Sequence, residues 1–204
     1  MKILNCYCGI GGNRKLWTPN SNEHEITAVE LDPKIASIYQ DFFPNDKVIV
    51  TDAHQYLLEH FKEYDFIWTS PPCPSHSRVN KLFSTHGKNP IRYPDMKLYE
   101  EILLLQNYYE GKFCIENVVS FYKPLIPPQE IDSHYFWTNF YIRPTAKKSR
   151  EHFGGFDRLT ARKGFDINKY TGINKIKTLR NCVEPETGLH IFNEAFKSPV
   201  KSLF

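Results

Sequence analysis

The sequence has few of the features that mark membrane-spanning, disulfide-rich or zinc-binding proteins. No hydrophobic run approaches the ~18 to 20 residues that a membrane helix needs, and the first residues do not form a signal peptide. The five cysteines are widely scattered and include no Cys-x-x-Cys pair, so neither a disulfide framework nor a metal site is expected. We therefore expect an intracellular, cytoplasmic protein that does not bind a membrane.

Length and composition are those of an ordinary globular protein. The 204 residues, 41% of them hydrophobic and 24% charged, are enough for one domain, or for one domain with a small appendage. A chain of this length buries roughly 70% of its extended surface on folding, so its core needs no disulfide or metal.

Acidic residues are scarce in one stretch, residues 143–180. It holds eleven Lys and Arg against three Asp and Glu, a net charge of +8, whereas the rest of the chain holds 15 basic and 20 acidic residues. A basic block in a mildly acidic chain is typical of a surface that binds a polyanion, although a solvated lysine-rich loop has the same composition.

Short apolar runs alternate with helical patterns. Strands are expected at residues 2–7, 25–30, 47–51, 66–69, 113–116 and 135–142. One helix should begin at Pro33 with Asp32 as its N-cap. A second helix, 95–109, has Met96, Tyr99, Leu103 and Gln106 on one stripe and Ile102, Leu105 and Tyr109 beside it. This alternation predicts an α/β fold with a mostly parallel sheet.

A glycine-rich turn, 7–12, directly follows the first expected strand. Ligands of such sheets lie at the carboxyl ends of the strands, where glycines let backbone N–H groups approach a cofactor. Glu30 ends the second strand and could hold both hydroxyls of a ribose, while Asp52 after the third could bind an adenine amino group or cap a helix. The spacing is not Gly-x-Gly-x-x-Gly and no Lys-Ser/Thr follows, so a cofactor without phosphate fits best. This indicates S-adenosylmethionine.

Cys73 and Glu116 are the candidate reactive residues. Three prolines surround Cys73 and fix the backbone, which suits an aimed nucleophile more than the small core residue that a cysteine usually is. His76 could lower the pKa of its thiol. Glu116 and Asn117 end a buried strand, where burial favours a neutral carboxyl that can donate a proton near neutral pH.

In this order, the segments resemble the DNA cytosine-5 methyltransferase family. The resemblance rests on residues 7–12, Glu30, Asp52, Pro72-Cys73, 95–97, Glu116-Asn117-Val118 and a closing motif at 180–186. It implies a Rossmann-like fold with helices on both faces of the sheet, a catalytic domain of residues 1–142 and 179–204, and a recognition region of 143–178. It implies S-adenosyl-L-methionine as cofactor and S-adenosyl-L-homocysteine as product, bound by Tyr7, Gly9, Gly11, Gly12, Glu30, Leu31, Asp52, Ala53, Pro72 and Asn181.

The resemblance also implies a reaction. The Cys73 thiolate would add to C6 of a cytosine, Glu116 would support protonation at N3, and C5 would take the methyl group. Loss of the C5 proton and expulsion of Cys73 would complete the turnover, with Asn117 holding Glu116 or the base. The cytosine must first leave the double helix, at a cost of a few kcal/mol.

The sequence departs from the family pattern at three places. Pro74 stands where a glutamine is usual, and His134 or Arg143 would have to replace a missing arginine motif. The recognition region is only 36 residues long. We expect double-stranded DNA to contact Ser77, Arg78, His134, Arg143, Lys147, Lys148, Arg150, Arg158 and Arg162.

Other functions stay open at this point. Amino methylation is disfavoured because Cys73 replaces the aromatic residue of its Ser-Pro-Pro-aromatic motif. An RNA cytosine-5 methyltransferase would use identical chemistry, and the short recognition region would also suit a non-catalytic DNA-binding module or subunit. For a DNA enzyme of prokaryotic or phage origin, a cognate restriction nuclease or a second subunit is a candidate partner.

Reversing the charge of Lys147, Lys148 and Arg150 together tests the role of the basic block. The plot of log affinity against log salt concentration has a negative slope. This slope should become less steep by about 0.9 for each phosphate that the variant no longer neutralises, so DNA binding should weaken and become less salt-dependent. A binding titration at several salt concentrations measures both effects. An unchanged salt slope would contradict the assignment.

Overall fold

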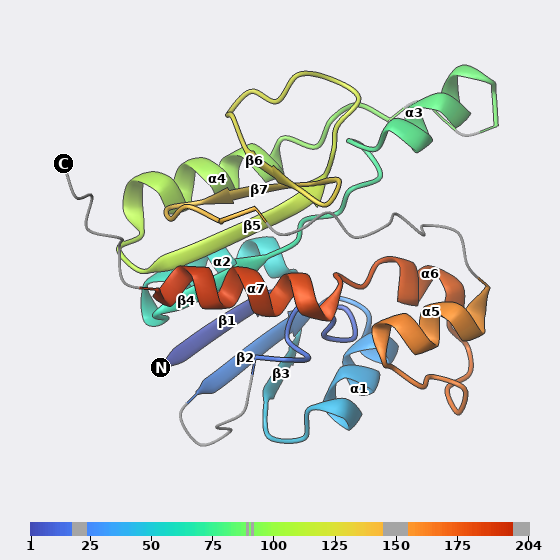
Figure 1. The fold of residues 1–204 in the computed structure, drawn as a ribbon, viewed down its shortest axis with the longest axis horizontal. Helices are drawn as coiled ribbons and strands as arrows, with labels where there is room; N and C mark the ends of the chain where they lie inside the picture. Colours follow the sequence, from blue (N-terminus) through green and yellow to red (C-terminus); the bar gives the residue numbers. More distant parts are fainter. Residues whose placement is uncertain (18–23, 89, 91, 145–154, 198–204) are drawn as a thin grey trace.

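The computed structural model describes residues 1–17, 24–88, 90, 92–144 and 155–197, and it contains one seven-stranded sheet (Figure 1). The strands are β1 (Lys2–Cys6), β2 (Glu25–Glu30), β3 (Lys47–Val50), β4 (Phe66–Thr69), β5 (Lys112–Val118), β6 (Gln129–Ile131) and β7 (His134–Thr138). Their order is β3-β2-β1-β4-β5-β7-β6. The first five strands are parallel, and β7 runs antiparallel to both of its neighbours. The predicted α/β fold with a mostly parallel sheet is confirmed.

Helices cover both faces of this sheet. The helices α1 (Pro33–Phe42) and α7 (Pro185–Phe196) pack on one face, and α2 (Ala53–His60) and α4 (Lys97–Tyr108) pack on the other. The short α5 (Phe156–Lys163) and α6 (Lys175–Arg180) lie beside α1, while α3 (Arg78–Thr85) extends away from the sheet (Figure 1). A 3-10 turn, Phe61–Glu63, follows α2. In the part of the chain that the structure describes, no helix is long and apolar enough to span a bilayer.

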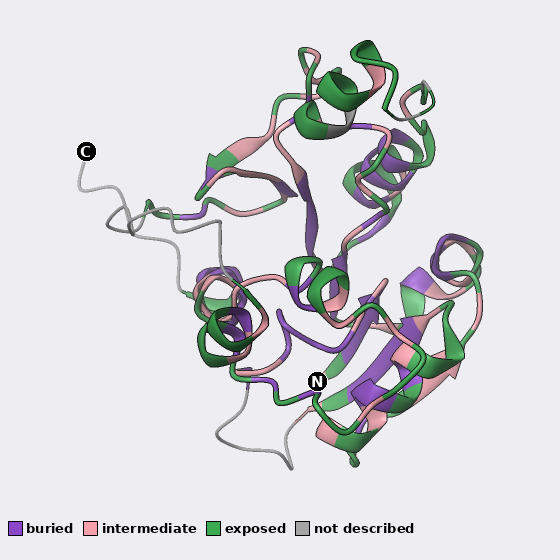
Figure 2. Ribbon diagram, turned by 90° about the vertical axis from the view of Figure 1, so that its right-hand side faces the viewer, coloured by how far each residue is buried: buried purple, intermediate pink, exposed green. Residues whose placement is uncertain are grey.

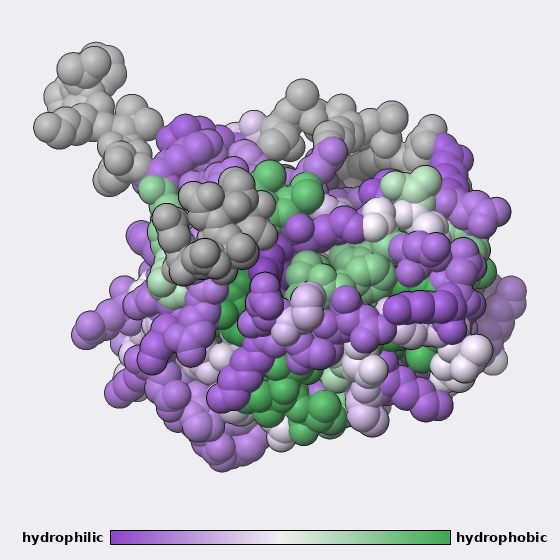
Figure 3. All heavy atoms as spheres, turned by 90° about the horizontal axis from the view of Figure 1, so that it is seen from below, coloured by the Kyte–Doolittle hydropathy of each residue, from purple (hydrophilic) through white to green (hydrophobic). Residues whose placement is uncertain are grey.

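The core consists of apolar side chains that alternate between the two faces of the strands. Ile3 of β1 packs with Trp68 and Phe192 on the α7 face, whereas the neighbouring Leu4 packs with Ile102 on the α4 face. Burial is concentrated in the strands and on the inner sides of the helices (Figure 2), and hydrophilic side chains cover most of the face shown in Figure 3. Both faces of the central strands are therefore buried, as expected for a parallel sheet.

The predicted orientation of α4 is wrong in part. Met96 and Leu103 are more than half exposed and Gln106 is also on the surface, although Tyr99 is buried as expected. Ile102, Leu105 and Tyr109, which are predicted to lie beside these residues, are buried, and the buried side also includes Leu98 and Glu101. The sequence pattern does not indicate the burial of Glu101, because a glutamate is normally expected on the exposed side of a helix.

The segment 182–188, which is called the closing segment below, packs directly against the glycine-rich turn and the residues that follow it. A Cβ atom at Gly12 would overlap Val183 and Cys182, and one at Gly188 would lie 2.7 Å from the Cα atom of Asn13. The indole N–H of Trp17 donates a hydrogen bond of 3.1 Å to the carbonyl oxygen of Gly188. Only glycine allows the two backbones to approach this closely.

Replacing Gly188 with alanine should destabilise the protein, although alanine normally favours a helix interior. The added methyl group overlaps backbone atoms of Asn13, which cannot move as a flexible side chain would. We expect a decrease of about 1 to 3 kcal/mol in the free energy of unfolding, measured with urea. Asn193→Ala, at an exposed position of the same helix, is the matched control and should change stability by about 0.5 kcal/mol or less. Equal stability of the two variants would contradict the packing argument.

Candidate active site

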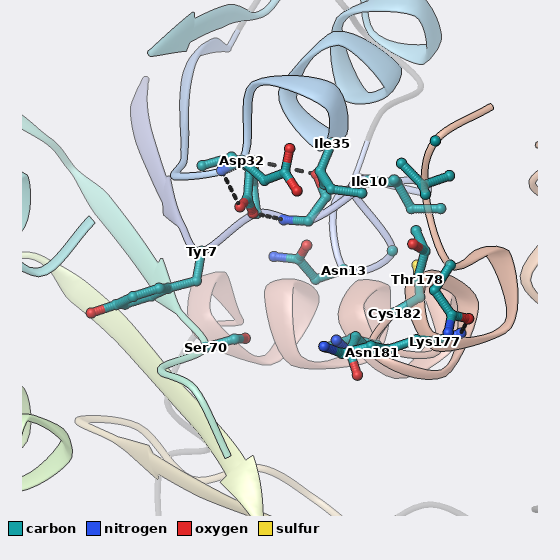
Figure 4. Close-up of a pocket in the computed structure, with 18 residues that line it drawn as sticks. Tyr7, Ile10, Asn13, Asp32, Ile35, Ser70, Lys177, Thr178, Asn181 and Cys182 are labelled. Atoms are coloured by element: carbon teal, nitrogen blue, oxygen red, sulfur yellow. Dashed lines mark hydrogen bonds between the residues drawn. The ribbon is translucent and has the colours of Figure 1, made fainter. Parts of the chain in front are cut away.

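A cavity of about 420 Å³ lies where the chain changes direction across the sheet. The strands β1 and β4 are paired up to their last residues, but the connection from β1 leads to β2 on one side and that from β4 leads to β5 on the other. The two connections therefore diverge at the carboxyl ends of β1 and β4. Tyr7 and Ser70 lie on one side of the cavity and Lys177, Thr178 and Asn181 on another (Figure 4). The volume falls within the range of about 300 to 1,000 Å³ that is typical of small-molecule sites.

The Glu30 carboxylate is held in a fixed orientation on the wall of this cavity. Its Oε2 atom accepts a hydrogen bond of 3.0 Å from the backbone N–H of Gly9, and Oε1 accepts one of 3.0 Å from that of Asp32 (Figure 4). The Asp32 side chain caps α1, as predicted, by accepting from the N–H of Lys34 at 2.8 Å. Each Glu30 oxygen keeps a second acceptor position, so the carboxylate can still bind two hydroxyl groups.

Tyr7 lines the cavity in a conformation that is unusual for a residue with a large side chain. Its φ of 53° lies in the left-handed region, which costs roughly 1 to 2 kcal/mol for a non-glycine residue. Its hydroxyl group donates a hydrogen bond of 2.7 Å to Oε1 of the buried Glu101. Burial and the nearby Glu101 charge raise the pKa of Tyr7 above its usual value, so the hydroxyl stays protonated and remains a donor.

The structure divides the predicted cofactor-binding residues into two groups. The cavity is lined by Tyr7, Gly9, Gly12, Glu30 and Asn181, but not by Gly11, Leu31, Asp52, Ala53 and Pro72. Asp52 caps α2, where its carboxylate accepts from the N–H groups of His54 at 2.8 Å and Gln55 at 3.2 Å. Leu31 is 68% exposed. For both groups a role toward the cofactor stays a prediction.

The sequence alone does not indicate several of the lining residues. They are Asn13, Asp32, Ile35 and Ser70, together with members of the segment 172–183. Asn13 follows the glycine-rich turn, and Ser70 precedes the loop that carries Cys73. Their positions in the chain are therefore the only sequence signal that they belong to the site. Lys177 and Thr178 belong to the basic block and to no recognisable motif, so only the folded chain reveals that α6 forms a wall of the cavity.

Hydrogen bonds attach the loop that carries Cys73, the nucleophile loop, to the end of β5 and to the segment that follows it. The Asn117 amide donates to the carbonyl oxygen of Pro71 at 3.0 Å, and the Arg78 guanidinium donates to that of Ser120 at 2.9 Å. Ser77 pairs with Ser120 in an isolated β-bridge. The His76 ring is 2.5 Å from the Tyr122 hydroxyl and is not bonded to the Cys73 thiol, so the structure does not form the interaction that His76 could have made. The loop that carries Cys73 is thereby held against the strand that carries Glu116 and Asn117.

Cys73 and Glu116 influence each other electrostatically. Burial, followed by the Glu116 charge, raises the pKa of Cys73 to about 11, while a hydrogen bond to its own backbone and the Lys177 ammonium group act in the opposite direction. Glu116 is 9% exposed, and its Oε1 atom lies 3.8 Å from Nε2 of His134. The structure thus brings the three predicted catalytic residues Cys73, Glu116 and Asn117 together and adds His134. Arg143, the other proposed replacement for the arginine motif, pairs with Glu194 instead, 3.6 Å away.

Part of the basic block is paired within the chain. Arg162 and Lys163 contact Glu184 at 3.1 and 2.7 Å, and Lys169 contacts Asp41 at 3.2 Å. Arg158 is exposed. The predicted DNA contacts Lys147, Lys148 and Arg150 lie outside the described residues. The charge that the block can offer to a polyanion is therefore smaller than its composition indicates.

Comparison with known proteins adds to this geometry. The family model described as C-5 cytosine-specific DNA methylase matches residues 1–124, which is more than half of the chain. The chain belongs to this family. The predicted resemblance is confirmed, and with it the cofactor S-adenosylmethionine, which supplies the methyl group in this methylase family.

Individual relatives of this chain are distant. A tRNA (cytosine(38)-C(5))-methyltransferase of Spodoptera frugiperda is 32% identical over 83 residues, 39% of this chain and 25% of that protein. The type II methyltransferase M1.HphI of Haemophilus parahaemolyticus is 25% identical over 125 residues, 58% of this chain and 32% of that protein. A mutant of Spodoptera frugiperda DNMT2 matches with a TM-score of 0.39 and 26% identity over 57% of this chain and 35% of that one. The chain thus aligns with a quarter to a third of the length of the curated relatives.

The raised pKa of Cys73 predicts how its reactivity depends on pH. Because only the thiolate is nucleophilic, alkylation of the free protein by iodoacetamide should accelerate about tenfold per pH unit from pH 7 to pH 10, whereas an ordinary thiol levels off near pH 8.5. Mass spectrometry identifies the modified residue. Removing the neighbouring charge with Glu116→Gln should lower the pKa and speed alkylation at pH 8, and Cys73→Ser is the blank. A plateau below pH 9 in the unmodified chain would contradict this account.

Proposed function

We propose that this chain is a DNA cytosine-5 methyltransferase that uses Cys73 as its nucleophile on a flipped-out cytosine. The observation that carries the proposal is that Cys73, Glu116 and Asn117 lie together, on the loop after β4 and on the adjacent strand β5. This loop begins at Ser70, which lines the cavity. Family membership gives the reaction class, and the arrangement of these three side chains supports a catalytic chain over a non-catalytic module. A module that only binds DNA has no chemical need for a nucleophile beside a buried acid.

The residues around the cavity suit S-adenosylmethionine. Glu30 has acceptor positions for the two ribose hydroxyls, and Tyr7 offers an aromatic face near the adenine. The glycine-rich turn presents close backbone, and the nearby Lys177, which helps to line the cavity, suits the carboxylate of an amino-acid group. When bound, this cofactor supplies an electrophilic methyl group.

The catalytic residues would then act in sequence. Cys73 would lose its thiol proton to solvent and its thiolate would add to C6 of the cytosine, while Glu116 would supply a proton to N3. C5 would then become electron-rich and take the methyl group, with S-adenosylhomocysteine as the other product. Loss of the C5 proton to water, expulsion of the Cys73 thiolate from C6 and return of the N3 proton to Glu116 would complete the turnover. Asn117 holds the nucleophile loop through Pro71, and His134 orients the Glu116 carboxylate.

Positive charge beside the nucleophile loop supports a nucleic-acid substrate. No Asp or Glu occurs between Asp65 and Asp95, and this interval contains Arg78, Lys81, Lys88 and Arg92. All four are exposed on or next to α3. This segment adds to the predicted contacts of the basic block, because a polyanion that reached Cys73 would pass close to it.

RNA is the alternative substrate. One relative is a tRNA methyltransferase and the other a type II methyltransferase, and the chemistry at the base is the same for both polymers. We favour DNA because the family description refers to DNA methylation. A two-subunit DNA enzyme, with the partner supplying base recognition, is compatible with the 36-residue region 143–178.

A 5-fluorocytosine trap tests the proposal. Fluorine at C5 cannot leave as a proton, so incubation of the protein with S-adenosylmethionine and duplex DNA that contains 5-fluorocytosine should give a covalent adduct on a denaturing gel. The adduct should be absent with Cys73→Ser and without the cofactor. An adduct formed only on fluorinated RNA would indicate that RNA, and not DNA, is the substrate. The absence of an adduct on either polymer would contradict the proposal that the chain is an active enzyme by itself.

A further inference from the structure

Glu101 is a fully buried carboxylate that receives hydrogen bonds from three side chains. It lies in α4 and has no exposed surface. Its Oε1 atom accepts from the Tyr7 hydroxyl at 2.7 Å and from Nδ1 of His54 at 3.0 Å, and its Oε2 atom accepts from the Thr69 hydroxyl at 2.7 Å. A buried carboxylate costs several kcal/mol unless such partners compensate it, and a leucine would fill this place on an apolar stripe at no such cost.

The partners of Glu101 come from the two strand ends on which the site is built. Tyr7 directly follows β1 and lines the cavity. Thr69 is the last residue of β4, and it is followed by Ser70, which also lines the cavity, and then by the loop with Cys73. One carboxylate therefore connects the glycine-rich turn to the start of the nucleophile loop, at the point where the two strands diverge.

Three titratable side chains face the Glu101 carboxylate: Tyr7, His54 and Cys6. The hydrogen bond to Glu101 raises the pKa of His54, burial acts in the opposite direction, and the Glu101 and Glu100 charges raise it further. The other nitrogen of His54 lies 3.1 Å from the Glu100 carboxylate. Lys97, 3.9 Å from Asp52, is the other charged group near this cluster. Tyr7 and Cys6, which also face Glu101, stay protonated because burial and the Glu101 charge raise the pKa of each.

We propose that Glu101 is a positioning residue that sets the Tyr7 ring against the methyl donor and fixes the start of the nucleophile loop through Thr69. This inference rests on the activity proposed above. It explains why Tyr7 is held at a φ of 53°: the bond to Glu101 keeps the ring at the cavity wall in a conformation that the isolated backbone disfavours. Glu101 itself touches neither the cavity nor the nucleophile.

The test is Glu101→Gln, which keeps the shape of the side chain but replaces one acceptor oxygen with a donor. Calorimetric binding of S-adenosylhomocysteine, well below the melting temperature, should weaken about tenfold or more. Tyr7→Phe, which removes only the hydroxyl group, should weaken binding by a similar factor, and the double variant should weaken it by less than the product of the two. Glu100→Gln, next in the chain with an exposed carboxylate, is the matched control and should bind within about twofold of the unmodified protein.

A second readout separates positioning from stability. The rate of the 5-fluorocytosine trap at saturating cofactor should fall with Glu101→Gln and with Thr69→Val, whereas Tyr7→Phe should act mainly on cofactor affinity. If Glu101→Gln melts at a lower temperature but binds and traps normally while folded, its role is structural and the inference is overturned. If Glu101→Gln does not fold, unchanged affinity in Tyr7→Phe together with an unchanged trap rate in Thr69→Val overturns it. An unmodified chain that fails to bind the cofactor would instead refute the proposed function.

Discussion

The divergence of β1 and β4 is the constraint on which the rest of the structure depends. The backbones of β1 and β4 are hydrogen-bonded to each other along the sheet. After these strands, however, the chain turns to opposite sides, so neither connection crosses the space beyond their carboxyl ends. The glycine-rich turn occupies one side of this space and the proline-fixed loop of Cys73 the other. Glu30, at the end of β2, lines this space, and Glu116 lies in β5, the strand that pairs with β4.

The sequence is sufficient to predict most of the sheet, because the central strands are short apolar runs that end at glycine, proline or acidic residues. The strands at 25–30 and 66–69 have the predicted bounds, and Asp32 caps α1 as expected. The strand β6 and the helices α3, α5 and α6 have no comparable signal, since they are short and carry few apolar residues. Their places are determined by contacts with distant parts of the chain.

In the site, too, some residues can be predicted from their place in the sequence, and others only from contacts between distant parts of the chain. Order in the chain indicates Cys73, Glu116 and Asn117, because each follows or ends a strand whose carboxyl end faces the same edge of the sheet. It cannot distinguish His134 from Arg143, since that choice depends on the antiparallel register in which Val118 pairs with His134. The order of residues in the chain does not indicate Glu101 either, because its burial and its three hydrogen-bond donors are known only from the folded structure.

The contact between the glycine-rich turn and the closing segment has a consequence for the order of events during synthesis. Trp17 and Gly188 are 171 residues apart, so the cavity cannot acquire its last wall until nearly all of the described chain has left the ribosome. Until then the aromatic side chains beneath α7 face water, and the growing chain has an exposed apolar surface on one side of its sheet. Completion of the methyl-donor site and protection from aggregation are therefore the same late step.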